Sequence, residues 1–501
     1  MAAPALTPMP VIKKAYLHRL EAKVVLALCG AVALMALVAA LAGYPQASTD
    51  DLFFFGPALG LVTTGRLTNV FADSGTPFYS YTPYYPYLLG TWMWVWGISA
   101  ASVVALQVVM MGIYAASAAL VVARFSRNYV ASLLVGALAF AGLKTLGIRP
   151  DSTAFAALGL GLALGCSNRG PIRAAGYTML MAATAVAPAM LSYSVAALLF
   201  CLLTGRDRVV WRTELLGIAF GILVNAIIFS ALIEFDYAGF IAGFRKHMEL
   251  TGHGQGKQYT TVLLSLFSYW IGLATNGPLL VCSLVMLAWL WWQKRPLSYV
   301  AWTSASCAYA AVILSVFLNS SSSTHWILVF LWTAAAILIT TSQAPVLLRG
   351  AVTLVLVGAY LLQSSASILS AIHSSPPDRA TAAQIQSVIH RIAPTTLYID
   401  CVAARYVYDY SLPAGMKPWE NFGRPFGEEV SSASNASSGA VAVVSTRQLN
   451  AYAPFKQFEF RYRPLVIGGR TLKSIPGDPY RMHVFWTPAS PQTQQARVWS
   501  E

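Results

Sequence analysis

Charged residues are scarce in this sequence. Only 10% of its 501 residues are Asp, Glu, Lys or Arg, whereas a soluble domain carries roughly 25%. Hydrophobic residues make up 57% of the chain, and the mean hydropathy is +0.59. This composition excludes an ordinary soluble domain and predicts an integral membrane protein.

Acidic residues are the rarer of the two charge types, at 19 against 33 Lys and Arg, which gives a formal net charge of +14. The Lys and Arg residues come in twos and threes between apolar runs, as cytoplasmic loops do. We therefore expect membrane lipids, and not nucleic acid, as the partner of this charge.

The common catalytic and metal-binding motifs are also absent. No HExxH, GxSxG or CxxC occurs, and of the six cysteines only Cys401 lies in a polar segment. Metalloprotease, serine hydrolase, zinc-site and disulfide-framework interpretations therefore have no support.

Long apolar runs fill most of the chain. The first, 24–43, follows four Lys and Arg residues and indicates an uncleaved span with a cytoplasmic N-terminus at 1–23, in preference to a signal peptide. We expect about eleven spanning helices in an α-helical polytopic protein. The further runs are 100–123, 129–147, 152–168, 174–188, 189–203, 213–234, 262–292, 298–318, 325–343 and 346–371.

Basic residues mark alternate connections between these runs, as the positive-inside rule requires. They are Arg124, Arg127, Arg169, Arg173, Arg206, Arg208, Arg212, Lys294 and Arg295. The opposite, outer side then receives a first loop at 44–99, a turn at 144–151 and a loop at 235–261. Two points stay open: Tyr87–Ser99 lies in the membrane interface or spans it, and Pro188 marks a tight turn or a kink.

The composition becomes that of a soluble domain after the runs end. We expect the transmembrane part to cover 24–372 and a small α/β domain outside the membrane to cover 373–501. In this tail "ATAAQIQSVIHRIA" has helical periodicity, while "TTLYID" and "AVAVVS" are typical of strands.

Two adjacent carboxylates, Asp50 and Asp51, follow the first run at the outer membrane surface. Such a pair resists dehydration and repels itself, so its position indicates water access or a function. Tyr81, Tyr84 and Tyr85 follow in "PFYSYTPYYPY"; they form an interfacial aromatic belt or a wall for a sugar ring.

Other outer segments carry groups suited to phosphate. Arg149 precedes Asp151, whose alternative role is in the first turn of a helix that starts near Pro150. His325 is a phosphate ligand or an interfacial His. The loop 235–261 gathers further cations that suit a lipid-linked phosphate or anionic headgroups. These cations are Arg245, Lys246, His247, His253 and Lys257.

The order of these features resembles the GT-C superfamily of membrane glycosyltransferases. The matching elements are the acidic pair with "ALGLVTTGRL" behind it, "YTPYYPYLLGTWMWVWGIS", "GIRPDSTAFAALGLGLALG" and "SYWIGLATNGPLLVCSLVMLAWLWW". The likeness covers 24–372 and is strongest to bacterial relatives of the protein O-mannosyltransferases and the lipid A aminoarabinose transferase. Asp instead of Glu at position 51 and the lack of Lys-Pro-Pro in the first outer loop distinguish the chain from the latter.

The resemblance implies transfer of a hexosyl or pentosyl group from a polyprenyl-phosphate donor to a glycan or lipid acceptor on the outer face of a bacterial inner membrane. It assigns the catalytic role to Asp50 or Asp51 by position. Donor phosphate binding falls to Arg149, Arg245, Lys246, Lys257 and His325, and sugar or acceptor binding to Tyr81, Tyr84, Tyr85 and Asp151. No cofactor is predicted firmly; members of the superfamily differ in metal use, which leaves a divalent cation open.

Two other functions stay open. A transporter or flippase of lipid-linked saccharides usually needs charges within its spans, and none lies mid-span here. An O-antigen polymerase or ligase typically has one large late outer loop, whereas the acids here follow the first span.

Overall fold

A computed structural model describes this chain at residues 51–69, 81–126, 148–204 and 210–251, in five short strands, and at isolated positions including Tyr79. The helices in the described part are α2 Asp51–Thr64, α3 Tyr84–Trp96, α4 Ala100–Ser126, α6 Asp151–Gly165, α7 Gly170–Val186, α8 Leu191–Thr204, α9 Trp211–Leu232 and α10 Tyr237–Thr251. The strands are β1 Thr396–Ile399, β2 Lys417–Glu420, β3 Ala440–Ser445, β4 Leu465–Ile467 and β5 Met482–Trp486.

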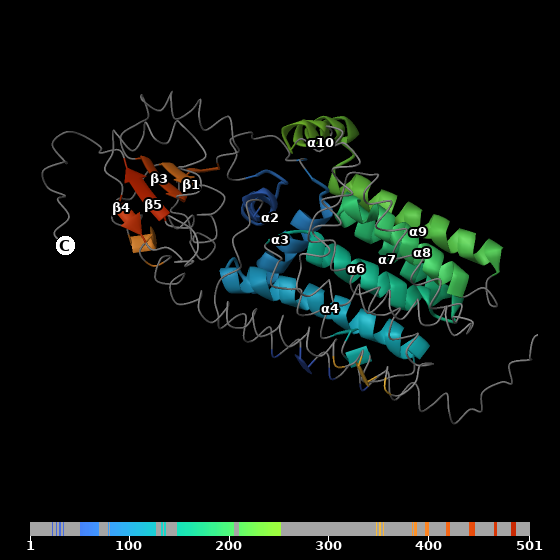
Figure 1. Cartoon of the computed structure of the whole chain (residues 1–501). Coiled ribbons are helices and arrows are strands. Elements are labelled where there is room, and N and C mark those ends of the chain that lie inside the picture. The colour runs from blue at the N-terminus through green and yellow to red at the C-terminus, as the bar shows by residue number, and fades with distance from the viewer. Residues whose placement is uncertain are drawn as a thin grey trace, which may run out of the picture.

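The helices lie side by side in one group, with α2 and α10 at one end of it and the sheet farther out beyond that end (Figure 1). Two of the described helices, over Ala101–Arg124 and Trp211–Leu232, are long and apolar enough to cross a membrane. They match the predicted spans 100–123 and 213–234. The predicted spans 152–168, 174–188 and 189–203 form the shorter helices α6, α7 and α8.

The remaining predicted spans lie outside the described residues or touch them only at isolated positions. They are 24–43, 129–147, 262–292, 298–318, 325–343 and 346–371. The count of about eleven spans therefore stays a prediction.

The segment 44–99, the predicted first outer loop, contains the two helices α2 and α3. The 13 residues of α3 extend over about 20 Å, less than the ~30 Å of a bilayer core. Trp94 and Trp96 near its end are 76% and 66% exposed. These dimensions agree with an interfacial position for this segment better than with a span.

Pro188 marks a tight turn. Ala187 has extended backbone angles and ends α7, and Pro188–Met190 forms a short 3-10 turn that leads into α8. Across the turn the Thr184 hydroxyl donates to the Ser194 hydroxyl at 3.0 Å. Farther along α8, the sulfur atom of Cys201 lies 3.8 Å from that of Cys166, at the end of α6. Because α7 starts just after Cys166, the later part of α8 lies near the start of α7, and the two helices are antiparallel.

Small residues allow α6 and α7 to cross closely. A side chain at Gly176 of α7 would place its Cβ atom 2.8 Å from the Gly161 carbonyl oxygen of α6. On the other side of α7, Gly217 and Gly221 of α9 form a GxxxG pair that packs against Ala174 and Thr178. Close backbone approach through small residues is the usual way in which membrane helices pack.

The C-terminal strands form one mixed sheet in the order β2-β1-β3-β5-β4. β1 is parallel to β2 and β3, while β5 is antiparallel to β3 and β4. The two strands predicted from "TTLYID" and "AVAVVS" are confirmed as β1 and β3. The helical prediction upstream agrees with helix at the described positions 383 and 385–387, whereas the boundary at 373 stays a prediction.

Candidate functional site

An ion pair stands at the start of α6, at the end of the helix group that carries α2 and α10. Arg149 Nε donates to the Asp151 carboxylate at 2.7 Å, and the side chains are 27% and 3% exposed. Pro150 is the N-cap residue, and Asp151 lies in the first turn, where the helix dipole also favours a carboxylate. The predicted helix start is confirmed, and it holds Arg149 partly exposed beside a buried acid.

A buried polar chain continues from this ion pair into the neighbouring helices. The hydroxyl of Ser152 donates to the Gln107 side-chain oxygen, and the Gln107 amide donates to the Tyr85 hydroxyl at 2.6 Å. Ser152, Gln107 and Tyr85 are each at most 4% exposed. The chain ties the start of α6 to α4 and to the first turn of α3.

The first turn of α2 lies against the tyrosine segment, by which we mean residues 79–87 with Tyr79, Tyr81, Tyr84 and Tyr85. The Phe54 ring meets the rings of Tyr81 and Tyr85 edge to face, with centroids 5.3 and 5.9 Å apart. Asp51 is the first residue of α2, one turn before Phe54. Asp50 and the side chain of Asp51 lie outside the described residues, so the catalytic assignment stays a prediction.

Tyr84 and Tyr85 have partners within the protein. The Tyr84 hydroxyl donates to the Asn225 carbonyl at 2.8 Å, and its ring stacks on Phe229. Burial raises the pKa of Tyr84 from 10.0 to about 12, and at either value the hydroxyl is protonated at neutral pH. These contacts give both tyrosines a packing role. Sugar binding by Tyr81, Tyr84 and Tyr85 stays a prediction.

The predicted basic loop 235–261 begins with helix α10, which packs on the tyrosine segment. The Tyr79 and Phe240 rings lie 6.0 Å apart, and the Tyr79 hydroxyl donates to the Ile233 carbonyl at 3.2 Å. Arg245 on α10 is exposed. Of the other predicted phosphate ligands, the Lys246 side chain, Lys257 and His325 lie outside the described residues.

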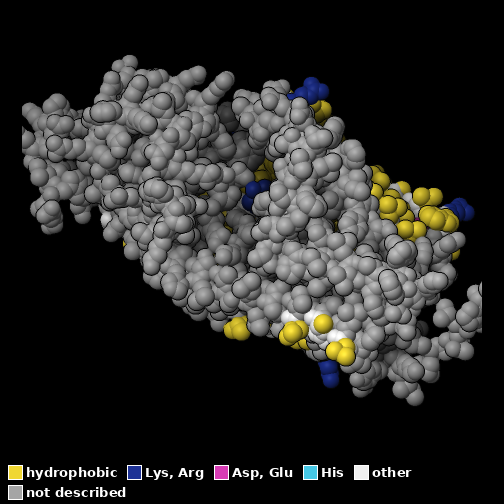
Figure 2. Space-filling view, viewed as in Figure 1, with side chains coloured by type: hydrophobic (Ala, Val, Ile, Leu, Met, Phe, Trp, Pro, Cys, Tyr) yellow, Lys and Arg dark blue, Asp and Glu magenta, His cyan; other side chains and the backbone are white. Residues whose placement is uncertain are grey.

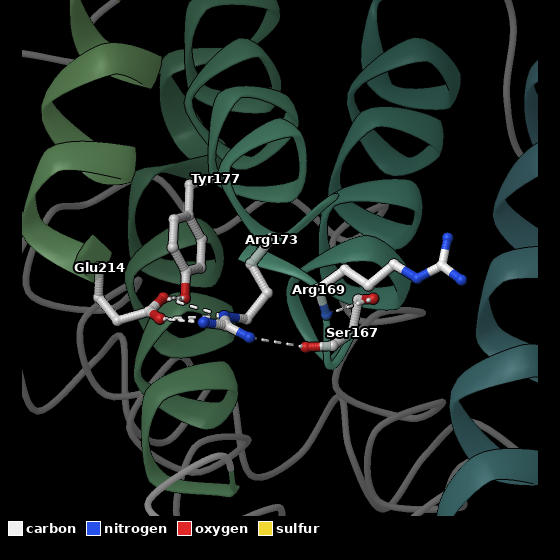
Figure 3. A network of polar contacts seen from close by, with 5 residues as sticks. All are labelled: Ser167, Arg169, Arg173, Tyr177 and Glu214. Carbon is white, nitrogen blue, oxygen red and sulfur yellow. Dashed lines mark hydrogen bonds and ion pairs between the residues drawn. The ribbon is translucent and has the colours of Figure 1, made fainter. Parts of the chain in front are cut away.

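A second polar cluster, which the sequence analysis missed, lies at the opposite end of the helices (Figure 3). Glu214 in the first turn of α9 accepts hydrogen bonds from Arg173, at 3.0 Å from Nε, and from the Tyr177 hydroxyl. Arg173 also donates to the Ser167 carbonyl at 3.3 Å. The signal in the sequence was an acid, Glu214, at the second position of the predicted apolar run 213–234. Gln107, a polar residue within the run 100–123, was missed in the same way.

No group of three His, Cys, Asp or Glu side chains suited to a metal ion occurs among the residues that the structure describes.

The fold is similar to that of crystal structures of ArnT, and this likeness confirms the predicted resemblance at the level of fold. Two crystal structures of ArnT, the lipid A aminoarabinose transferase, from Cupriavidus metallidurans are similar to this chain. The apo structure matches with a TM-score of 0.55 at 14% identity and covers 92% of this chain and 97% of ArnT. The structure bound to undecaprenyl phosphate matches with a TM-score of 0.55 at 13% identity, covering 91% and 97%. No protein-family model and no curated protein matches the sequence.

Proposed function

We propose that this protein is a glycosyltransferase that moves a sugar from a polyprenyl-phosphate donor to a glycan or lipid acceptor on the outer face of a bacterial inner membrane. One observation carries the proposal. The first turn of α2, the tyrosine segment and the Arg149–Asp151 ion pair, far apart in sequence, meet at one end of the helices. The fold, shared with an ArnT structure bound to undecaprenyl phosphate, supports the lipid-linked donor.

In this proposal one carboxylate of the acidic pair, Asp50 or Asp51, is the general base. It takes the proton of an acceptor hydroxyl while that oxygen attacks the anomeric carbon of the donor sugar. The bond between this carbon and the phosphate oxygen breaks, and its electron pair leaves with the polyprenyl phosphate. Direct displacement of this kind inverts the anomeric centre.

The cations of the outer face stabilise the leaving phosphate. Arg149 is held in place by Asp151 through its Nε atom, which fixes the direction of the guanidinium. Arg245 is exposed on α10, which packs on Tyr79 beside the same site. Lys246, Lys257 and His325 complete the proposed phosphate-binding set.

The test is transfer of radiolabelled sugar from a polyprenyl-phosphate donor by purified protein. We expect Asp50→Asn or Asp51→Asn to lower the rate by at least about 100-fold, the range for a lost general base. Arg149→Gln should lower kcat more than it raises KM, because it removes charge stabilisation of the leaving group. Arg169→Gln is the control, since this arginine is exposed at the opposite end of the helices.

Equal amounts of folded protein, checked by size-exclusion chromatography, are compared in each case. A wild-type protein that binds the donor without releasing sugar would contradict the proposal and favour a transporter of lipid-linked saccharides. Full activity in both Asn variants would remove the acidic pair from the reaction centre.

A further inference from the structure

A groove of about 600 Å³ runs between α7 and α9 at the end opposite the proposed transferase site. Its volume lies within the range of small-molecule sites. Apolar and small residues dominate its lining. The lining residues used below are Gly170, Thr213, Leu216, Phe220 and Leu223.

The length of the groove matches one leaflet of a membrane. From Thr213 to Leu223 the α9 axis rises about 15 Å, half of the ~30 Å hydrocarbon core of a bilayer. The groove starts next to Trp211 and Arg212, which are both exposed. Trp and Arg mark the membrane interface, so the mouth of the groove lies at headgroup depth.

The outer wall of the groove faces the lipid tails. Leu216, Phe220 and Leu223 are 64%, 56% and 58% exposed. Only 17% of the most apolar part of α9 is buried within the protein. Figure 2 shows hydrophobic side chains exposed along α9, with Lys or Arg side chains at the end of the helix. An alkyl chain in this groove would stay in continuous contact with the surrounding tails.

The mouth of the groove is electropositive. α7 and α9 run parallel, because Arg173 pairs with Glu214 near their starts and Thr178 accepts from Asn225 farther along. Both positive helix N-termini therefore meet at the mouth, where parallel dipoles repel each other. The carboxylate of Glu214 accepts hydrogen bonds from Arg173 and Tyr177. Its negative charge is therefore balanced by Arg173, and it does not neutralise the exposed Arg212.

We propose that this groove binds an anionic phospholipid of the leaflet on the arginine-rich side, with one acyl chain between α7 and α9 and the phosphate at Arg212 and the two helix N-termini. The shape of the groove selects an alkyl chain, and the charge at its mouth selects an anionic headgroup over a zwitterionic one.

The test is native mass spectrometry of the full-length protein, titrated with phosphatidylglycerol or with phosphatidylcholine of the same acyl chains. We expect tighter binding of phosphatidylglycerol. Arg212→Gln should weaken it about fivefold, the effect of one basic residue at a membrane surface. Gly170→Leu should weaken it at least about tenfold, because a Cβ atom there meets only Thr213 Cγ2, at 3.9 Å, and the longer side chain extends over the mouth.

Two matched variants serve as controls. Ala175→Leu places the same leucine side chain on the exposed face of α7, outside the lining, and Arg66→Gln removes an exposed arginine after α2. Both variants should bind phosphatidylglycerol as wild type does. If Gly170→Leu misfolds, Arg212→Gln decides the outcome, because Arg212 is exposed and its replacement disturbs no packing.

Equal affinity for the two lipids, or full binding by Arg212→Gln, would overturn the proposal. So would a wild-type protein that takes up no lipid because a second copy or another segment of the chain fills the groove. Binding of polyprenyl phosphate that outcompetes phosphatidylglycerol and is lost in Gly170→Leu would assign the groove to the donor lipid instead.

Discussion

The carboxylate of Glu214 is 2% exposed and depends on its donors. Arg173, whose side chain is 12% exposed, contacts it through two nitrogen atoms, and Tyr177 contributes its hydroxyl. Removing one member of a buried ion pair leaves the other charge without compensation. Replacing both members by apolar residues of similar volume is often close to neutral.

We therefore expect Glu214→Ala to lower the free energy of unfolding by about 3–5 kcal/mol. The double variant Arg173→Met with Glu214→Leu should recover most of that loss. Denaturant titration in mixed micelles measures both. If the double variant is as unstable as Glu214→Ala, the loss of stability does not come from the unpaired charge of Arg173, and the explanation is wrong.

Single residues differ in how far the sequence predicts their contacts. Arg149 and Asp151 stand on either side of Pro150. The helix start at Pro150 was predicted, but the ion pair was not, because the sequence analysis assigned Arg149 to phosphate and Asp151 to the first turn or to a sugar. Gln107 meets Ser152 across 45 positions of sequence. Only the packing of α4 on α6 brings these two together, and periodicity carries no information about that.

At the scale of the helices, glycines allow the backbones of α6 and α7 to approach closely where the two helices cross. The glycines of "GLGLALG" suit such an approach, but they do not identify the partner helix. The sequence is also ambiguous at Pro188, because a proline between two apolar runs is found both in tight turns and in kinked helices. The contacts of Thr184 with Ser194 and of Cys166 with Cys201 decide for the turn.

The close crossing of α6 and α7 can be tested by adding one methyl group at Gly176. Gly176→Ala would place its Cβ atom 2.8 Å from the Gly161 carbonyl oxygen, so we expect a loss of about 1–3 kcal/mol of stability from overpacking. Gly170→Ala is the matched control at the start of the same helix. It should be neutral or slightly stabilising, because the site is open and Ala favours a helix more than Gly does. Thermal unfolding in detergent compares the two, and equal Tm values would contradict the close crossing.

At the scale of the whole molecule, the sequence predicted which residues share an end of the helices. Arg124 at the end of α4 donates to the Ala163 carbonyl near the end of α6, at 3.0 Å. Arg173 joins the start of α7 to the start of α9. At the other end, the Thr82 hydroxyl donates to the Val186 carbonyl at 2.6 Å. The basic residues on alternate loops predict which helix ends lie together, because positive charge and span direction are coupled in membrane proteins.

This arrangement predicts opposite accessibility for the two ends of α9. Trp211 and Phe235 lie just inside and just beyond the helix and are 63% and 67% exposed. In a background without the six native cysteines, a membrane-impermeant maleimide should label Phe235→Cys in intact spheroplasts. Trp211→Cys should react only after permeabilisation, because the positive-inside rule predicts that the arginine-rich end faces the cytoplasm. Detergent-solubilised protein, in which both positions should react, serves as the control. The reverse labelling pattern would place the Arg149–Asp151 site on the cytoplasmic side, and a lipid-linked donor would then have to be used there.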